Sequence, residues 1–147
     1  MPIFIGADHR GFDLKNKLIE YLQENNIRVE DMGNYDYDPQ DDYPEFAKKV
    51  AQAVLQNPHD SLGIIICGSG VGVAIAANRF KGIRCGVGFN EAQVKHIREN
   101  DNINVLALPS DFITFDQAKK LVDVFRRTEA KKEEKYSRRR KMLDELI

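Results

Sequence analysis

Tryptophan is absent from this sequence, and only two cysteines occur among its 147 residues. Both cysteines, Cys67 and Cys85, lie in apolar segments, so there is no disulfide framework and a reducing cytoplasm is the expected compartment. The first residues, MPIFIGADHRG, lack the basic and long apolar segments of a secretory signal. Residues 61–78 form an uncharged stretch, but four glycines interrupt it and a membrane span needs about 20 apolar residues. We therefore expect a cytoplasmic protein with no membrane partner.

A strong excess of either charge is also missing. The net charge is −1 and the pI is about 6.3, which excludes a general attraction to nucleic acid. Charge is uneven along the chain, with seven acids and no Lys or Arg over residues 30–45, and nine bases over residues 126–141. Both runs are typical of a solvated surface. RNA binding by the basic run is a weaker alternative, because Tyr136 is its one aromatic residue.

Apolar segments of strand and helix type alternate along the chain. Strands are expected over 2–7, 27–32, 62–67, 82–87 and 103–108. Helices are expected over 12–25, from Pro44 to Leu55, after Gly72, over 91–99, after a cap at Thr114, and over 132–146. Such alternation predicts one α/β domain over residues 1–147. We expect a three-layer Rossmann-like sandwich with a five-stranded parallel sheet and a C-terminal helix.

Ligands of parallel sheets bind beyond the carboxyl ends of the strands. Three polar loops are expected there: residues 8–10, residues 67–70 and the residues after Leu108. The first two are the more promising site builders.

The segment from Gly68 to Gly72 predicts a glycine turn at the start of a helix. Exposed N–H groups of Gly68, Ser69, Gly70, Val71 and Gly72 would favour an anion, either a phosphate or an oxyanion formed during a reaction. The glycine spacing differs from the dinucleotide-binding pattern, and no Gly-Lys-Ser/Thr follows for a P-loop. We therefore expect no nucleotide cofactor.

Polar residues beside this turn are candidates for chemistry. Cys67 is either a small buried core residue or a thiol activated at the end of a strand, and position alone favours neither. Ser69 is either a turn residue or a proton relay. Asp8 is a common type of helix cap, and His9 can be purely structural, but both lie at the expected ligand-binding edge.

Two further groups lie late in the chain. Asn100, Asp101 and Asn102 are either a polar turn that ends a helix or part of the site, and their place before the fifth strand gives them low weight. Lys135 and Arg139 are four residues apart on the expected basic helix, so their side chains would project together as a phosphate clamp.

Taken together, these segments resemble the ribose-5-phosphate isomerase B family, which includes the galactose-6-phosphate isomerase subunits. The matching segments are GADHRGFDLK, DDYPEFAKKVA, GIIICGSGVGVAIAANRFKGIRC, NINVLAL and EEKYSRRRKML, which together span essentially the whole chain. The CGSGVG block followed by AANRFKGIR is the most specific of them.

The resemblance implies a metal-free aldose–ketose isomerase that acts on a sugar phosphate. Cys67 matches the catalytic base, Ser69 matches a hydroxyl that assists proton movement, and the N–H groups of residues 68–72 would form an oxyanion hole. Asp8 and Tyr43 match positions near the substrate, and His9 matches one near its phosphate. The resemblance also implies a homodimer, or a dimer of dimers, in which the C-terminal helix reaches the partner's site.

Three positions depart from the family pattern. Asn100 replaces a histidine thought to open the sugar ring, so that ring opening would fall to His9 or to solution, or the substrate would differ. Asp111 replaces an arginine and would repel a phosphate. Lys135 replaces another arginine, which keeps the charge without the bidentate geometry, and Arg139 matches directly.

We therefore expect an isomerase that interconverts a sugar phosphate pair, with ribose 5-phosphate and ribulose 5-phosphate the first choice. The alternatives are an isomerase of a six-carbon sugar phosphate and a sugar-phosphate-binding subunit with little catalysis.

Overall fold

The computed structural model describes the whole chain, residues 1–147. In chain order the elements are β1 (Ile3–Ala7), α1 (Phe12–Glu24), β2 (Val29–Asp31), α2 (Tyr43–Gln56), β3 (Leu62–Cys67), α3 (Val71–Ala77), β4 (Cys85–Val87), α4 (Glu91–Asp101), β5 (Val105–Pro109), α5 (Phe115–Arg127) and α6 (Glu134–Asp144). The strands form one sheet in the order β2-β1-β3-β5-β4, and every neighbouring pair is parallel. The predicted α/β class and five-stranded parallel sheet are confirmed.

The predicted bounds of several elements are wrong. The strands expected over 27–32 and 82–87 are the two edge strands, and each is only three residues long. Each edge strand pairs with only one neighbouring strand, so it is no longer than the segment that pairs with that neighbour. The last helix covers 134–144 rather than 132–146, and Pro44 is the second residue of α2, not the first. Thr114 does cap α5, through a capping box with Gln117.

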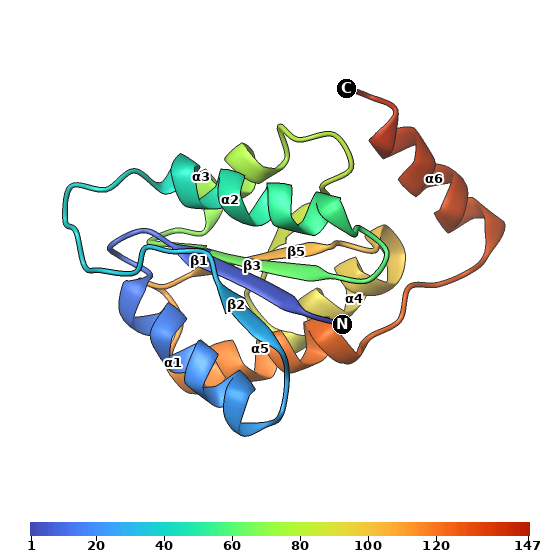
Figure 1. Cartoon of the computed structure of the whole chain (residues 1–147). Coiled ribbons are helices and arrows are strands. Elements are labelled where there is room, and N and C mark those ends of the chain that lie inside the picture. The colour runs from blue at the N-terminus through green and yellow to red at the C-terminus, as the bar shows by residue number, and fades with distance from the viewer.

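Three layers make up the molecule (Figure 1). Helices α2 and α3 cover one face of the sheet, and α1, α4 and α5 cover the other. Each face holds its own cluster of buried apolar side chains, 17 residues on the α1 side and 12 on the α2 side. Burial of apolar area on this scale is the main stabilising contribution to such a fold.

Strand β3 lies at the centre of the sheet, and all six of its residues are buried. Ile64 and Ile66 belong to the cluster under α1, whereas Ile65 and Cys67 belong to the cluster under α2 and α3. Burial on both faces explains the absence of charge from residues 62–67. It also places the Cys67 side chain on the face from which α3 departs.

An ion pair between a buried lysine and a half-buried aspartate fixes the edge of the sheet near the first loop. The side chain of Lys15, on α1, is fully buried, and its Nζ lies 2.9 Å and 2.8 Å from the two carboxylate oxygens of Asp31. Asp31 ends β2 and also accepts a hydrogen bond from the N–H of Gly33, at 2.9 Å. The pair therefore ties α1 to the start of the 33–42 loop.

Helix α6 lies beside the edge where the strands begin and stands apart from the two helical layers (Figure 1). Two contacts hold it: Arg84 Nη1 lies 3.0 Å from Asp144, and Arg140 donates to the backbone oxygens of Asn100 and Lys131. No helix is both long and apolar enough to cross a membrane.

Candidate active site

Three loops meet at the carboxyl edge of the sheet. The loops after β1 and β3 are adjacent, because Ala7 pairs with Ile66 in the parallel ladder. The loop after β5 joins them: Ser110 donates its N–H to the Cys67 oxygen at 3.0 Å and its hydroxyl to the Arg10 oxygen at 2.9 Å. The third loop was expected to be the least promising of the three, yet it contacts both of the others.

The turn between β3 and α3 presents free backbone donors. Gly70 has a φ of 74°, a left-handed conformation that glycine adopts without strain. The N–H groups of Gly68, Ser69, Gly70 and Gly72 donate no hydrogen bond within the protein, whereas the N–H of Val71 donates to Ser69 Oγ at 3.2 Å. Such a turn suits an anion or a developing oxyanion.

Cys67 ends β3 directly before this turn. Cys67 is 5% exposed, and its backbone oxygen accepts hydrogen bonds from the N–H and the hydroxyl of Ser110. The backbone is therefore held firmly, and no disulfide engages the thiol. The second cysteine differs: burial raises the pKa of Cys85, so its thiol stays protonated at neutral pH.

Asp8 is buried in the loop after β1. Its Oδ1 accepts hydrogen bonds from the N–H groups of Arg10, at 3.0 Å, and Gly11, at 3.2 Å, which organises the turn that leads into α1. Burial raises the pKa of Asp8 and outweighs these hydrogen bonds, which act in the opposite direction. The capping role considered for Asp8 is wrong, because Gly11 is the N-cap of α1 and no side chain caps that helix; Asp8 holds the preceding turn instead.

His9 is held by Asp41, a residue that the sequence did not single out. His9 Nδ1 and its backbone N–H lie 2.8 Å and 3.0 Å from Asp41 Oδ1, and Asn34 donates to Oδ2. Burial alone would raise the pKa of Asp41, but the hydrogen bonds from His9 and Asn34 lower it, so Asp41 stays ionised. This arrangement makes Nδ1 the protonated nitrogen of His9 and leaves Nε2 free for proton exchange.

Tyr43 reaches the turn from the other side. It is the first residue of α2, and its ring packs on the backbone of Gly72, where an added Cβ would lie 2.7 Å from Tyr43 Cε1. Tyr43 as a whole is 40% exposed. The carboxyl edge therefore gathers Asp8, His9, Tyr43 and the 67–72 segment around one point.

Arg10 and Asp111 form an ion pair above the turn. Arg10 Nη2 and Nε lie 2.8 Å and 2.9 Å from the same oxygen of Asp111. Asp111 stands where the resemblance implied an arginine, and its charge was expected to repel a phosphate. The structure shows that this charge is compensated by Arg10, which lies in the predicted polar loop of residues 8–10 but was not singled out as a site residue.

The remaining predicted site residues lie at the opposite edge. Asn100 and Asp101 end α4, before β5 begins, whereas Cys67 pairs with Pro109 at the end of β5. The length of β5 separates the two edges by roughly 13 Å, at 3.3 Å per residue. Lys135 and Arg139 are exposed on α6, where both lie against the Tyr136 ring. One chain therefore does not bring these four residues to Cys67.

Asn100 has an unexpected neighbour in His96, one helical turn earlier. Its Nδ2 lies 2.8 Å from His96 Nε2, and its Oδ1 is buried without a hydrogen-bond partner. An imidazole is thus present next to the position where the resemblance implied one. The helical spacing of four residues was the signal that sequence reasoning missed.

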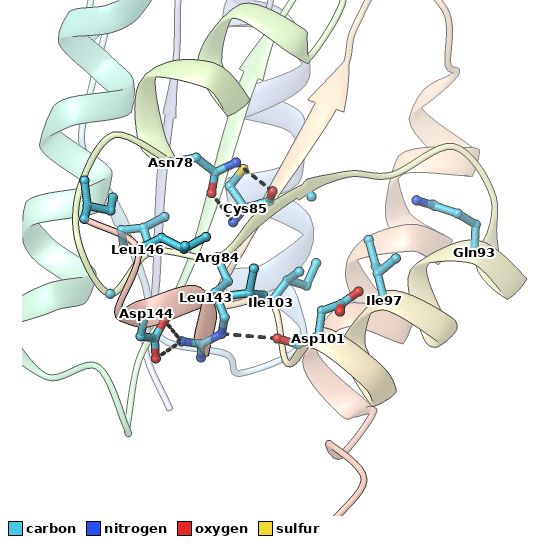
Figure 2. Close-up of a pocket in the computed structure, with 14 residues that line it drawn as sticks. Asn78, Arg84, Cys85, Gln93, Ile97, Asp101, Ile103, Leu143, Asp144 and Leu146 are labelled. Atoms are coloured by element: carbon cyan, nitrogen blue, oxygen red, sulfur yellow. Dashed lines mark hydrogen bonds and ion pairs between the residues drawn. The ribbon is translucent and has the colours of Figure 1, made fainter. Parts of the chain in front are cut away.

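A cavity of about 520 Å³ also lies toward the amino edge, between β4, α4 and the C-terminal residues. Figure 2 shows the Asn78 side chain hydrogen-bonded to the backbone of Cys85. It also shows Arg84, which donates to the Asp144 carboxylate and to the backbone oxygen of Asp101. Leu143, Leu146 and Ile147 line the cavity and are otherwise exposed. Its lining contains neither Cys67 nor the glycine turn.

One cluster has the composition of a metal site. Ligand atoms of Asp8, His9 and Asp41 lie within 4.8 Å of one another. The Nδ1 of His9 is already engaged by Asp41, at 2.8 Å. The arrangement suits a hydrogen-bonded imidazole and does not need an ion to explain it.

Comparison with known proteins matches this chain to isomerases. Residues 3–143 match the family model described as Ribose/Galactose Isomerase. A probable ribose-5-phosphate isomerase B of Mycoplasma pneumoniae is 43% identical over 124 residues, which cover 84% of this chain and 81% of that protein. The ribose-5-phosphate isomerase B of Escherichia coli is 40% identical over 123 residues, with the same shares covered.

The similarity extends to three-dimensional structure. The crystal structure of ribose-5-phosphate isomerase B from Mycoplasma genitalium, with bound ribulose 5-phosphate, has a TM-score of 0.94 to this chain and 39% sequence identity. The match covers 97% of this chain and 93% of that one. The predicted three-layer architecture is therefore one that such proteins share.

Proposed function

The chain belongs to the ribose/galactose isomerase family, and we propose that it interconverts ribose 5-phosphate and ribulose 5-phosphate. The observation that carries the proposal is the turn after β3, where Cys67 lies next to four unused backbone donors. Ribulose 5-phosphate is bound by the similar Mycoplasma genitalium protein. No nucleotide cofactor and no metal is needed for this chemistry, and we assign none.

Cys67 acts as the base in the proposed mechanism. Its thiolate takes the proton from C2 of the open-chain aldose, and the electron pair moves to form an enediolate. The proton then returns to C1, which gives the ketose. Proton abstraction next to a carbonyl needs a base whose position is fixed, and the backbone bonds of Ser110 to Cys67 supply that rigidity.

The turn stabilises the enediolate. The N–H groups of Gly68, Ser69, Gly70 and Gly72 have no acceptor in the protein, so they are available to the oxygen on which charge develops. Ser69 is exposed and its hydroxyl moves protons between the sugar oxygens. Asp8 and Tyr43 line the substrate-binding position, together with Val71 at the start of α3.

His9 opens the sugar ring in this proposal. Asp41 holds Nδ1–H, so Nε2 can take a proton from the anomeric hydroxyl and return one to the ring oxygen. An imidazole can both accept and donate a proton, which suits both transfers. Asn100 has no such capacity, and its neighbour His96 is the competing candidate.

We further propose a homodimer with shared sites, in which α6 and the end of α4 of one chain complete the site of the other. Asn100, Asp101, Lys135 and Arg139 lie too far from Cys67 to serve it within one chain. Apolar side chains exposed on α3 and at the C-terminus support such an interface, because water would otherwise cover them; they are Val71, Ile75, Met142, Leu143, Leu146 and Ile147. Two such dimers can associate further.

The decisive experiment is a direct isomerase assay. Ribose 5-phosphate, allose 6-phosphate and galactose 6-phosphate are compared with unphosphorylated ribose, and we expect ribose 5-phosphate to have the highest kcat/KM. If a six-carbon sugar phosphate is turned over in preference to ribose 5-phosphate, the protein is a six-carbon sugar phosphate isomerase of the same family. Calorimetric binding of ribose 5-phosphate without turnover would favour a binding subunit, the alternative that Asn100 suggests.

The two free thiols and the absence of a disulfide fit a reducing compartment. We therefore place the protein in the cytoplasm, which the recovery of its activity in a cytosolic rather than an exported fraction would test.

A further inference from the structure

The Arg10–Asp111 ion pair lies directly over the glycine turn. A Cβ built on Gly68 would lie 2.7 Å from Asp111 Oδ2 and 2.9 Å from Arg10 Nε. The pair is therefore in contact with Gly68, at the start of the turn that the proposed mechanism assigns to the enediolate. Exposed ion pairs contribute little to folding stability, so stability alone does not account for this one.

The backbone of Arg10 is fixed at both of its peptide groups. Its N–H donates to Asp8 Oδ1 at 3.0 Å, and its oxygen accepts from Ser110 Oγ at 2.9 Å. The side chain, by contrast, is 57% exposed. A rigid loop thus presents a guanidinium that an incoming ligand can reach.

The guanidinium is only partly used by Asp111. Its Nε and Nη2 both contact one carboxylate oxygen, Oδ2. A guanidinium has five N–H donors, so three are left, including both of Nη1. Guanidinium groups bind phosphate oxygens in bidentate geometry, and a phosphate carries more negative charge than the carboxylate that now holds Arg10.

We propose that Arg10 binds the phosphate group of the substrate and that Asp111 is a positioning residue, which holds the guanidinium over the turn. The inference rests on the proposed function, because it assigns one end of that substrate to a residue of this chain. Asp111 thereby changes from an obstacle to phosphate binding into a support for the group that binds it.

Two single variants separate binding from a structural role. Arg10→Ala removes both the cation and the ion pair, whereas Asp111→Asn removes the pair's opposite charge but keeps the cation and an acceptor oxygen. If Arg10 binds phosphate, Arg10→Ala raises KM for ribose 5-phosphate about tenfold or more. Asp111→Asn keeps the guanidinium but weakens the ion pair that positions it, so KM should rise less, by about threefold. The kcat of both variants changes little.

Controls come from the same chain. Arg28→Ala removes an exposed arginine that is paired with Glu30 at 3.3 Å, far from the turn, and should leave KM unchanged. The double variant Arg10→Asp with Asp111→Arg exchanges the two charges and should recover part of the lost affinity. Unphosphorylated ribose should be turned over equally by the wild type and Arg10→Ala.

Inorganic phosphate is the probe that does not depend on isomerase activity. Its binding, measured by calorimetry, should weaken in Arg10→Ala by the same factor as KM rises. Equal phosphate binding by the wild type and Arg10→Ala would overturn the inference, as would equal losses in Arg10→Ala and Asp111→Asn. Phosphate binding that depends on Arg10 in a protein without isomerase activity would overturn the proposed function and leave this inference intact.

Discussion

The two edges of the sheet differ in how they are built. At the carboxyl edge, short loops are bonded to one another through backbone groups, and they hold buried or half-buried side chains in fixed places: Asp8, His9, Asp41 and Cys67. At the amino edge, the candidate residues lie on the surfaces of α4 and α6. Proton transfer needs fixed geometry, whereas binding of a charged group tolerates longer, more mobile side chains. The first edge is thus suited to chemistry, and the second has the role of completing a neighbour's site only in the proposed dimer.

The two cysteines provide the sharpest test of this difference. Cys67→Ala removes the proposed base at the carboxyl edge, and we expect kcat to fall about 10³-fold, within the range typical of general base catalysis. Cys85→Ala, toward the amino edge, is the matched control and should retain full activity. Steady-state kinetics on ribose 5-phosphate, with circular dichroism to verify folding, measure both. A Cys67→Ala variant with wild-type turnover would remove Cys67 from the mechanism.

A heterodimer tests whether the two edges belong to one shared site. Chains carrying Cys67→Ala and Arg139→Ala are co-expressed with different tags, and the mixed dimer is purified by both tags. One of its two sites would then combine an intact Cys67 with an intact Arg139 from the partner chain. We expect about half of the wild-type activity, well above either homodimer. Activity equal to the mean of the two homodimers would argue for sites within single chains.

The two imidazoles test the assignment of ring opening. His9→Ala should lower kcat/KM for ribose 5-phosphate about 10²-fold, because only the open-chain fraction remains a substrate. At high enzyme concentration its rate should stop rising, since spontaneous ring opening then limits turnover. His96→Ala should show neither effect. The reverse pattern would transfer the role to the amino edge and to His96 of a partner chain.

Asp8 gives the smallest expected effect, on stability. Because burial raises the pKa of Asp8, its ionised form costs free energy of folding at neutral pH. Asp8→Asn keeps the acceptor for the N–H groups of Arg10 and Gly11 without that cost. Thermal unfolding at pH 7 should therefore give a Tm at or above the wild-type value, although activity falls.

The raised pKa of Asp8 also determines how the stability of the protein changes with pH. A carboxyl whose folded pKa is raised binds protons more readily in the folded state, so the wild type loses stability as the pH rises from the ordinary value of 3.8 through the folded pKa. The advantage of Asp8→Asn should accordingly shrink as the pH falls toward 3.8. A variant that is clearly less stable at pH 7 would show that the carboxylate is needed for folding.

Much of the fold followed from local pattern. The uncharged run over residues 61–78 is strand β3 with the turn and helix after it. In α1, α2 and α5, the apolar residues that recur at helical spacing form the buried face of each helix. Glycine spacing correctly identified the turn at Gly70. Edge strands were harder, because their length depends on the register with a single neighbour rather than on their own residues.

The candidate site was predictable only in part. Cys67, Ser69, Asp8 and His9 were recognisable because polar residues followed apolar strands. Asp41 was not, since seven acids lie between residues 30 and 45 and charge alone does not identify the one that returns to His9. Arg10 and Asp111 are 101 residues apart, and nothing local to either residue indicates the pair.

The sequence alone therefore determined the class of fold, the central strand, the glycine turn and the thiol beside it. These features depend on the spacing of apolar residues and on the conformational freedom of glycine, both of which involve only a few neighbouring residues. Tertiary structure decided which charges meet and which candidate residues stay apart. Ion pairs and hydrogen bonds depend on distances of about 3 Å between atoms, and only the parallel register of the strands sets those distances. That register brings Arg10 and Asp111 together over the turn, and it leaves Asn100 and Arg139 at the other edge.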